Sequence, residues 1–155
     1  MQKLVLYSAL SLILFVACSK DKFQDAPSVT IKSITPTQVP LQSSMVMELE
    51  FTDKQGDVDS IFLIKSRLNS VQVPVLNNFY LPFKLPDFPE KTKGDIKITL
   101  TYNEYLVTAQ KARNQPGAPN DREPDTLNFK IVLKDKSGNV GDTVITDNIV
   151  VERFN

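Results

Sequence analysis

Apolar and polar residues alternate along several stretches of the chain, and a period of two is typical of a β-strand with one buried face. The clearest stretch is 44–52, because a helix would place Glu48 and Glu50 among its apolar residues. The same pattern predicts strands at residues 28–34, 95–102, 126–134 and 142–152. The side chains expected to face the core are Met45, Met47, Leu49, Phe51, Ile96, Ile98, Leu100, Tyr102, Leu127, Phe129, Ile131, Leu133, Ile145, Ile149 and Val151.

Residues 58–67 form an extended run whose apolar side chains do not alternate. The four residues at 61–64 are all apolar, which is typical of a strand covered on both faces. Residues 71–75 are expected to form a short edge strand that ends near Pro74.

Two proline-containing segments are expected to lie outside the regular strands. Residues 81–93 contain Pro82, Pro86 and Pro89, which exclude a helix or a central strand. Residues 108–125 hold three prolines and a glycine among mostly polar residues. We expect this segment to be the least structured part of the domain, and loops of such length are often functional or disordered.

About seven strands, no convincing helix and proline-rich connections favour an all-β fold, a single antiparallel β-sandwich. We expect the immunoglobulin-like form of the sandwich, and a small β-barrel is the alternative. The domain is expected to cover residues 28–155, with residues 18–27 as a polar tether before it.

Residues 1–17 have the features of an export signal. Lys3 is followed by an apolar run of about 14 residues, too short for a bilayer that needs about 20. Cys18, the only cysteine, follows the small residue Ala17 and resembles the lipidated cysteine of a bacterial lipoprotein signal. Cleavage would leave Cys18 first, carrying diacylglycerol and an acyl chain, a stable anchor. The alternative is an ordinary secretory signal with an incidental cysteine.

Composition excludes several kinds of function. The 18 basic and 18 acidic residues balance, so we expect no nucleic-acid partner, which would require a basic stripe. The absence of histidine excludes a Ser-His-Asp device and a zinc site made of His and Cys. The five glycines do not form a phosphate-binding motif. A carboxylate pair for sugar hydrolysis stays compatible with the sequence, but a chain without tryptophan is a poor candidate. We therefore expect no enzyme activity.

Two turns share the pattern Asp-Lys-X-Gly-(Asp or Asn)-Val, at residues 53–58 and 135–140. In an immunoglobulin-like sandwich these two connections lie at the same end. They would gather oxygen ligands suitable for Ca²⁺, namely Asp53, Asp57, Asp59, Asp135, Asn139 and Asp142. The alternative is that these residues serve the turns and solubility, because Asp and Gly are ordinary turn residues and neither loop has the EF-hand spacing.

Four segments resemble small outer-membrane lipoproteins of Bacteroidetes-type bacteria. They are Cys-Ser-Lys-Asp at 18–21, Phe-Thr-Asp-Lys-Gln-Gly-Asp-Val at 51–58, Ala-Arg-Asn-Gln-Pro-Gly-Ala-Pro-Asn-Asp at 112–121 and Leu-Lys-Asp-Lys-Ser-Gly-Asn-Val at 133–140. The resemblance implies an outer-membrane lipoprotein with an immunoglobulin-like domain. Such proteins usually carry Asp-Gly-Asp-Gly-Asp at the first turn, whereas this chain has Lys54 and Gln55 there.

Together these features predict a non-enzymatic module of the cell envelope. It would be anchored to the outer membrane through Cys18, on the periplasmic face or the cell surface. It would bind a protein or a glycan through one end of the sandwich or through residues 108–125. The alternative is a structural or accessory subunit of a periplasmic or outer-membrane assembly, stabilised by calcium.

Overall fold

The computed structural model describes residues 25–154, so the predictions for residues 1–17 and for Cys18 lie outside the described range. This range contains nine strands, whereas about seven were expected. The strands are β1 (Ser28–Thr35), β2 (Gln38–Val39), β3 (Ser44–Thr52), β4 (Val58–Arg67), β5 (Tyr80–Lys84), β6 (Lys93–Thr101), β7 (Asp125–Asp135), β8 (Val144–Ile145) and β9 (Ile149–Val151). A π-helical turn, η1 (Tyr102–Leu106), and a 3₁₀ turn, η2 (Pro119–Asp121), complete the elements. The predicted all-β class is confirmed.

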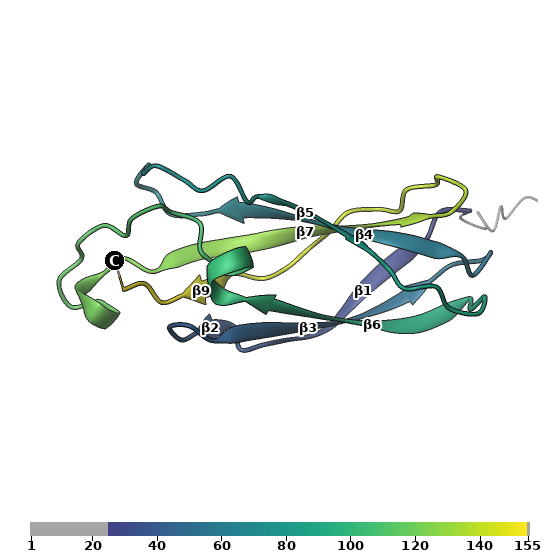
Figure 1. Cartoon of the computed structure of the whole chain (residues 1–155), viewed down its shortest axis with the longest axis horizontal. Helices are drawn as coiled ribbons and strands as arrows, with labels where there is room; N and C mark the ends of the chain where they lie inside the picture. Colours follow the sequence, from purple (N-terminus) through teal and green to yellow (C-terminus); the bar gives the residue numbers. More distant parts are fainter. Residues whose placement is uncertain (1–24, 155) are drawn as a thin grey trace, which may run out of the picture.

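The strands form two separate sheets that stack as two layers (Figure 1). The three-stranded sheet has the order β1-β3-β6, and the six-stranded sheet has the order β2-β9-β7-β4-β5, with β8 paired to β7. The strand pairs are antiparallel except for β2 and β9, which run parallel. Two stacked sheets make a sandwich, so the alternative expectation of a closed barrel is wrong.

The core lies between the sheets, where the alternation places the apolar side chains. Met45, Met47 and Leu49 of β3 are fully buried, and Phe51 is 3% exposed. Each such side chain contributes about 1.5–3 kcal/mol through its removal from water. The predicted inward residues of β3, β6 and β7 are all buried, and so is Tyr102 at the start of η1.

One predicted core residue faces solvent. Ile145 of β8 is 54% exposed, whereas Ile149 and Val151 of β9 are fully buried as expected. The reason is register: β8 pairs with β7 so that Ile145 lies opposite Lys130, and directly opposite residues point to the same face of a sheet. Lys130 is exposed, so Ile145 is on the outer face too.

Strand β4 is covered on one face only, which corrects the prediction for residues 61–64. Ile61 and Leu63 are fully buried, whereas Phe62 and Ile64 are half-buried on the opposite, outer face of the six-stranded sheet. The strand therefore alternates in burial although its sequence does not alternate in polarity. Its outer apolar residues are a feature of the surface.

The edge strand β5 was missed because it contains a proline. The N–H of Lys65 donates to the Phe79 carbonyl (2.7 Å), and the N–H of Leu85 donates to the Asp59 carbonyl (2.8 Å). In this antiparallel register the backbone N–H and C=O groups of every second β5 residue bond to β4. Pro82 is one of the other residues, whose backbone groups face away from β4. Its missing N–H therefore costs no ladder bond.

The predicted edge strand at residues 71–75 is absent from the described structure. Only an isolated bridge joins Val75 to Ala109 there.

Among the described residues, no helix is both long enough and apolar enough to cross a membrane.

The long connection between η1 and β7 is irregular, as expected, but its two ends are firmly held. Asp125 is 1% exposed, and its Oδ2 accepts the N–H groups of Thr108 (2.8 Å) and Ala109 (3.3 Å). The same oxygen pairs with the Arg153 guanidinium at 2.5 Å, and Arg153 also donates to the Ala109 carbonyl at 3.0 Å. These bonds fasten both ends of the loop to the C-terminal segment.

Candidate functional site

Three of the six residues predicted as calcium ligands come together at one end of the sandwich. Asp53 follows β3, Asp57 precedes β4, and Asp135 is the last residue of β7. One carboxylate oxygen from each residue lies within 4.8 Å of the others. Because β3 and β7 belong to different sheets, this cluster joins the two layers at their end.

The turn geometry explains why these side chains point inward. The Asp57 N–H donates to Asp53 Oδ2 at 2.9 Å, so the Asp53 carboxylate caps its own turn. Asp135 caps the second turn in the same way, because Asn139 donates from its N–H (2.7 Å) and from Nδ2 (2.8 Å). Gly56 and Gly138 supply positive φ angles of 73° and 92°, which their turns require.

Two of the three residues are almost fully buried, Asp57 is half-buried, and no ion pair among the described residues compensates their charge. Asp53 and Asp135 are 3% and 1% exposed, and the ion pairs of residues 25–154 include none to the three carboxylates. Asp53 Oδ1 and Asp57 Oδ1 are buried without a hydrogen-bond partner. Burial raises the pKa of Asp57, and the neighbouring charges of Asp135 and Asp53 raise it further.

The other three predicted ligands have different contacts. Asp59 forms an ion pair with Lys84 and accepts a hydrogen bond from Ser60 at 2.7 Å, and the bond from Lys84 lowers the pKa of its carboxyl. Asn139 donates to Asp135 instead of offering an oxygen beside it. Asp142 is exposed and lies outside the cluster.

A second feature, which sequence reasoning missed, is the outer face of the six-stranded sheet. The register places Phe62 opposite Pro82 on one side and Val132 on the other, and Ile64 opposite Tyr80. Phe62 and Tyr80 stack with ring centroids 5.9 Å apart and planes inclined by 19°. The apolar surface formed in this way, the apolar sheet face, consists of Phe62, Ile64, Tyr80, Pro82 and Val132, and Lys130 separates it from Ile145 of β8.

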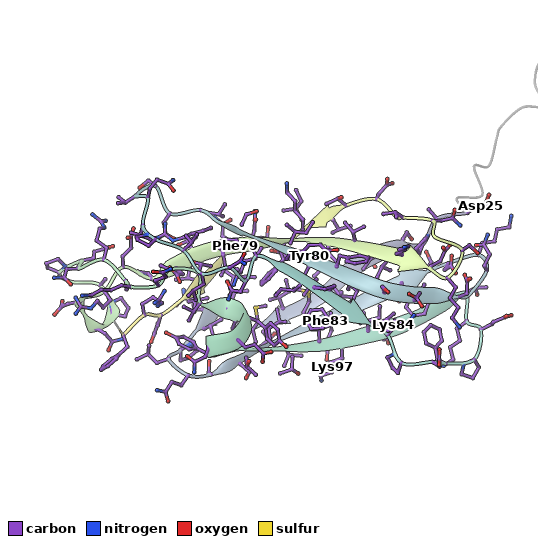
Figure 2. The ribbon with its side chains drawn as sticks, turned by 45° about the horizontal axis from the view of Figure 1, so that its top comes forward. Asp25, Phe79, Tyr80, Phe83, Lys84 and Lys97 are labelled. Atoms are coloured by element: carbon purple, nitrogen blue, oxygen red, sulfur yellow. The ribbon has the colours of Figure 1, made fainter. Side chains whose placement is uncertain are left out.

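The apolar sheet face is exposed and bordered by lysines. Tyr80, whose position on β5 is labelled in Figure 2, is 58% exposed. Lys130 lies opposite Ile64 and Ile145, and Lys134 lies opposite Ser60. The signal for this face was the run of four consecutive apolar residues in β4, which was interpreted as a strand covered on both sides.

The outer face of the three-stranded sheet has the opposite character. Three cross-strand ion pairs cover it: Lys32–Asp95 at 3.1 Å, Lys93–Glu50 at 2.9 Å and Lys97–Glu48 at 3.1 Å. Their side chains are at least 29% exposed, so each pair adds little stability. This outer face is therefore charged, whereas the outer face of the six-stranded sheet is apolar.

No protein-family model matches the sequence, and no curated protein matches it. The crystal structure of a FixG-related protein from Vibrio parahaemolyticus is similar to this chain, with a TM-score of 0.41 and 13% sequence identity. The similarity covers 83% of this chain and 99% of that one.

Proposed function

We propose that the protein is a non-enzymatic, lipid-anchored domain of the cell envelope that binds a protein partner through the apolar sheet face. The observation that carries this proposal is the exposed Phe62–Tyr80 stack within an apolar surface on one sheet. Exposed apolar surface that is contiguous and has a polar border is typical of protein-interaction sites. Tyrosine is enriched among the residues that dominate binding energies.

The strand order supports an immunoglobulin-like form of the sandwich. In that fold, strands A, B and E share one sheet, and strands G, F and C share the other. Here β1-β3-β6 and β9-β7-β4 follow the same order, and β5 adds to the second sheet at the C-strand side. The apolar sheet face then corresponds to the outer surface of the G-F-C sheet.

The position of the first described residues supports an anchor at one end. Asp25 lies 3.7 Å from Lys54 in the β3–β4 turn (Figure 2), and the Pro27 carbonyl lies directly against Gly141. Six residues lie between Cys18 and Asp25, so the seven steps from one Cα atom to the next span at most about 25 Å when fully extended. An acylated Cys18 would therefore hold the acidic end of the sandwich close to the outer membrane.

The partner inferred from this surface is a protein that presents an apolar patch flanked by carboxylates. Apolar and aromatic side chains would fill the centre of the interface, and the lysine border would meet acidic groups. Lys130 and Lys134 make no ion pair with another described residue, so both ammonium groups are available. A second copy of this chain would bring these lysine borders together, which is unfavourable.

The test compares variants on the two outer sheet faces. We expect Tyr80→Ala and Lys130→Glu to weaken co-purification of the partner from gently solubilised envelopes by tenfold or more. Lys97→Glu on the three-stranded sheet is the matched control and should retain the partner, because its side chain is 66% exposed on the opposite face. Equal recovery with all three variants would contradict the proposed surface, and so would recovery of the chain only as a dimer of itself.

A further inference from the structure

Asp53, Asp57 and Asp135 form no ion pair with a described lysine or arginine. Removing carboxylates from water without a counter-charge is strongly unfavourable. Buried carboxylates are therefore neutralised by a proton or accompanied by a cation. The geometry of the three carboxylates decides between a proton and a cation.

The separation of the oxygens fits a hard divalent cation. Ca²⁺ binds oxygen ligands at 2.3–2.6 Å, so two ligands of one ion lie no more than about 5 Å apart. The three carboxylates each offer an oxygen within 4.8 Å of the other two. Small shifts of the side chains therefore suffice for one ion to contact all three oxygens, and the strands need not move.

An independent observation points to a missing ligand. Asp53 is 3% exposed and its Oδ2 accepts the Asp57 N–H, while its Oδ1 is buried with no partner. Asp57 Oδ1 is also buried and has no hydrogen-bond partner. Buried acceptors normally have a partner in folded proteins, and two unsatisfied acceptors in one cluster indicate that something else binds them.

An approach to the cluster from solvent exists. Asp57 lines a pocket of about 150 Å³ whose wall also carries the acidic side chains of Asp59, Asp87 and Glu90 and the basic side chain of Lys136. A cavity of that size admits several water molecules. These waters can complete the coordination of an ion that receives only three protein ligands.

We propose that Asp53, Asp57 and Asp135 bind one hard divalent cation, of the size and preferences of Ca²⁺, which fastens the β3–β4 turn to the end of β7. The cation joins the two sheets at the end where the chain enters the domain. This inference is independent of the apolar sheet face, because the two surfaces share no residue.

The experiment titrates Ca²⁺ and, separately, Mg²⁺ into the chelator-treated full chain. Binding is measured by calorimetry, and the melting temperature is measured with and without the metal. We expect one site per chain, a dissociation constant of roughly 0.1–1 mM as in extracellular modules, and a melting temperature about 5 °C higher in 10 mM Ca²⁺. Stronger binding of Mg²⁺ than of Ca²⁺ would overturn the assignment to Ca²⁺.

Variants separate the site from non-specific binding. Asp53→Asn and Asp57→Asn should abolish both the heat and the melting shift. Asp95→Asn is the matched control and should keep both, since its side chain is 67% exposed and lies outside this pocket. Asp57 is half-buried, so its variant keeps the test valid if Asp53→Asn does not fold.

Two results would overturn the inference. The first is wild-type protein that gives no heat and no melting shift in 10 mM Ca²⁺. The second is an Asp57→Asn variant that melts above the metal-free wild type while the wild type ignores the metal. That second result would show that the carboxyl groups share a proton instead.

Discussion

Lys65 shows how a buried charge is tolerated inside this sandwich. Its side chain is 2% exposed, and Nζ donates to Asn78 Oδ1 (3.1 Å) and to the carbonyls of Tyr105 (2.5 Å) and Val107 (3.1 Å). Three acceptors match the three donors of an ammonium group. Burial nevertheless lowers the pKa of Lys65 to about 8, and the charge of Asp125 opposes that shift.

The lowered pKa predicts that stability rises with pH over a defined window. Between about pH 8 and 10.5 the folded protein has released the Lys65 proton while the unfolded chain retains it, so rising pH favours the folded state. Below pH 8 Lys65 is protonated in both the folded and the unfolded state, so the folded state bears the full cost of burying its charge. We expect the free energy of unfolding of the wild type to increase relative to Lys65→Met, by up to about 1.4 kcal/mol per pH unit. Urea unfolding from pH 7 to 9.5 measures this, and a flat difference would contradict it.

The buried ion pair between Asp125 and Arg153 predicts that an isosteric substitution will strongly lower the free energy of unfolding. Asp125→Asn keeps the shape of the side chain but removes a buried negative charge that faces the guanidinium groups of Arg153 (2.5 Å) and Arg67 (3.5 Å). We expect a loss of about 3–5 kcal/mol in the free energy of unfolding. Asp95→Asn removes an exposed pair with Lys32 and should cost far less, because water and salt screen exposed charges. Similar losses for the two variants would show that the buried pair is not structural.

At the scale of the elements, the facing of the strands can be tested with two phenylalanines. Phe129 of β7 is fully buried between the sheets, whereas Phe62 of β4 lies half-buried on the outer face. Phe129→Ala should cost about 3–5 kcal/mol because it leaves a cavity in the core. Phe62→Ala should cost clearly less, because its surroundings include solvent. Chemical denaturation of both variants checks the order, and equal costs would mean that the outer face is covered.

Sequence reasoning identified the strands whose polarity alternates and failed where another constraint decided the structure. Residues 44–52 and 126–134 were predicted within a residue of β3 and β7, because one buried face imposes a period of two. Strand β5 was missed because Pro82 appeared to exclude a strand, although its position on the open edge makes it harmless. The outward turn of Ile145 depends on its register with β7, which the local sequence does not reveal.

The candidate sites were predictable to different degrees. The repeated turn pattern located Asp53, Asp57 and Asp135 at one end, since two related turns at one end of a sandwich bring their first residues together. The turn pattern did not predict that Asp59 pairs with Lys84, because Lys84 belongs to β5, a strand that the sequence did not predict. The apolar sheet face depends on pairings among β5, β4 and β7, and β7 lies far from the other two in the sequence.

At the scale of the whole molecule, the strands run lengthwise between two dissimilar ends (Figure 1). The acidic cluster lies at the end where the chain enters, and η2 lies at the other end, where Asn120 contacts the Arg153 carbonyl at 3.5 Å. A lipid on Cys18 would therefore direct η2 away from the membrane. The apolar sheet face would stand at the side of the domain, accessible to a neighbouring protein.

This orientation can be measured with a fluorophore at each end. Because lipidation would occupy the only native cysteine, Ser137→Cys and Asn120→Cys can each be labelled selectively in the acylated protein. With the protein in vesicles that contain a headgroup quencher, we expect strong quenching at position 137 and little at position 120. The reverse order would contradict an anchor at the N-terminal end.

The binding surface itself is tested most directly by photo-crosslinking in intact cells. A photoreactive phenylalanine analogue replaces Tyr80 on the apolar sheet face, or Thr99 on the outer face of the three-stranded sheet, where Thr99 is exposed. We expect a protein adduct from position 80, none from position 99, and loss of the adduct in the Lys130→Glu, Lys134→Glu background. Equal adducts from both positions, an adduct with a second copy of the chain, or an adduct with a glycan would contradict the proposed surface and its partner.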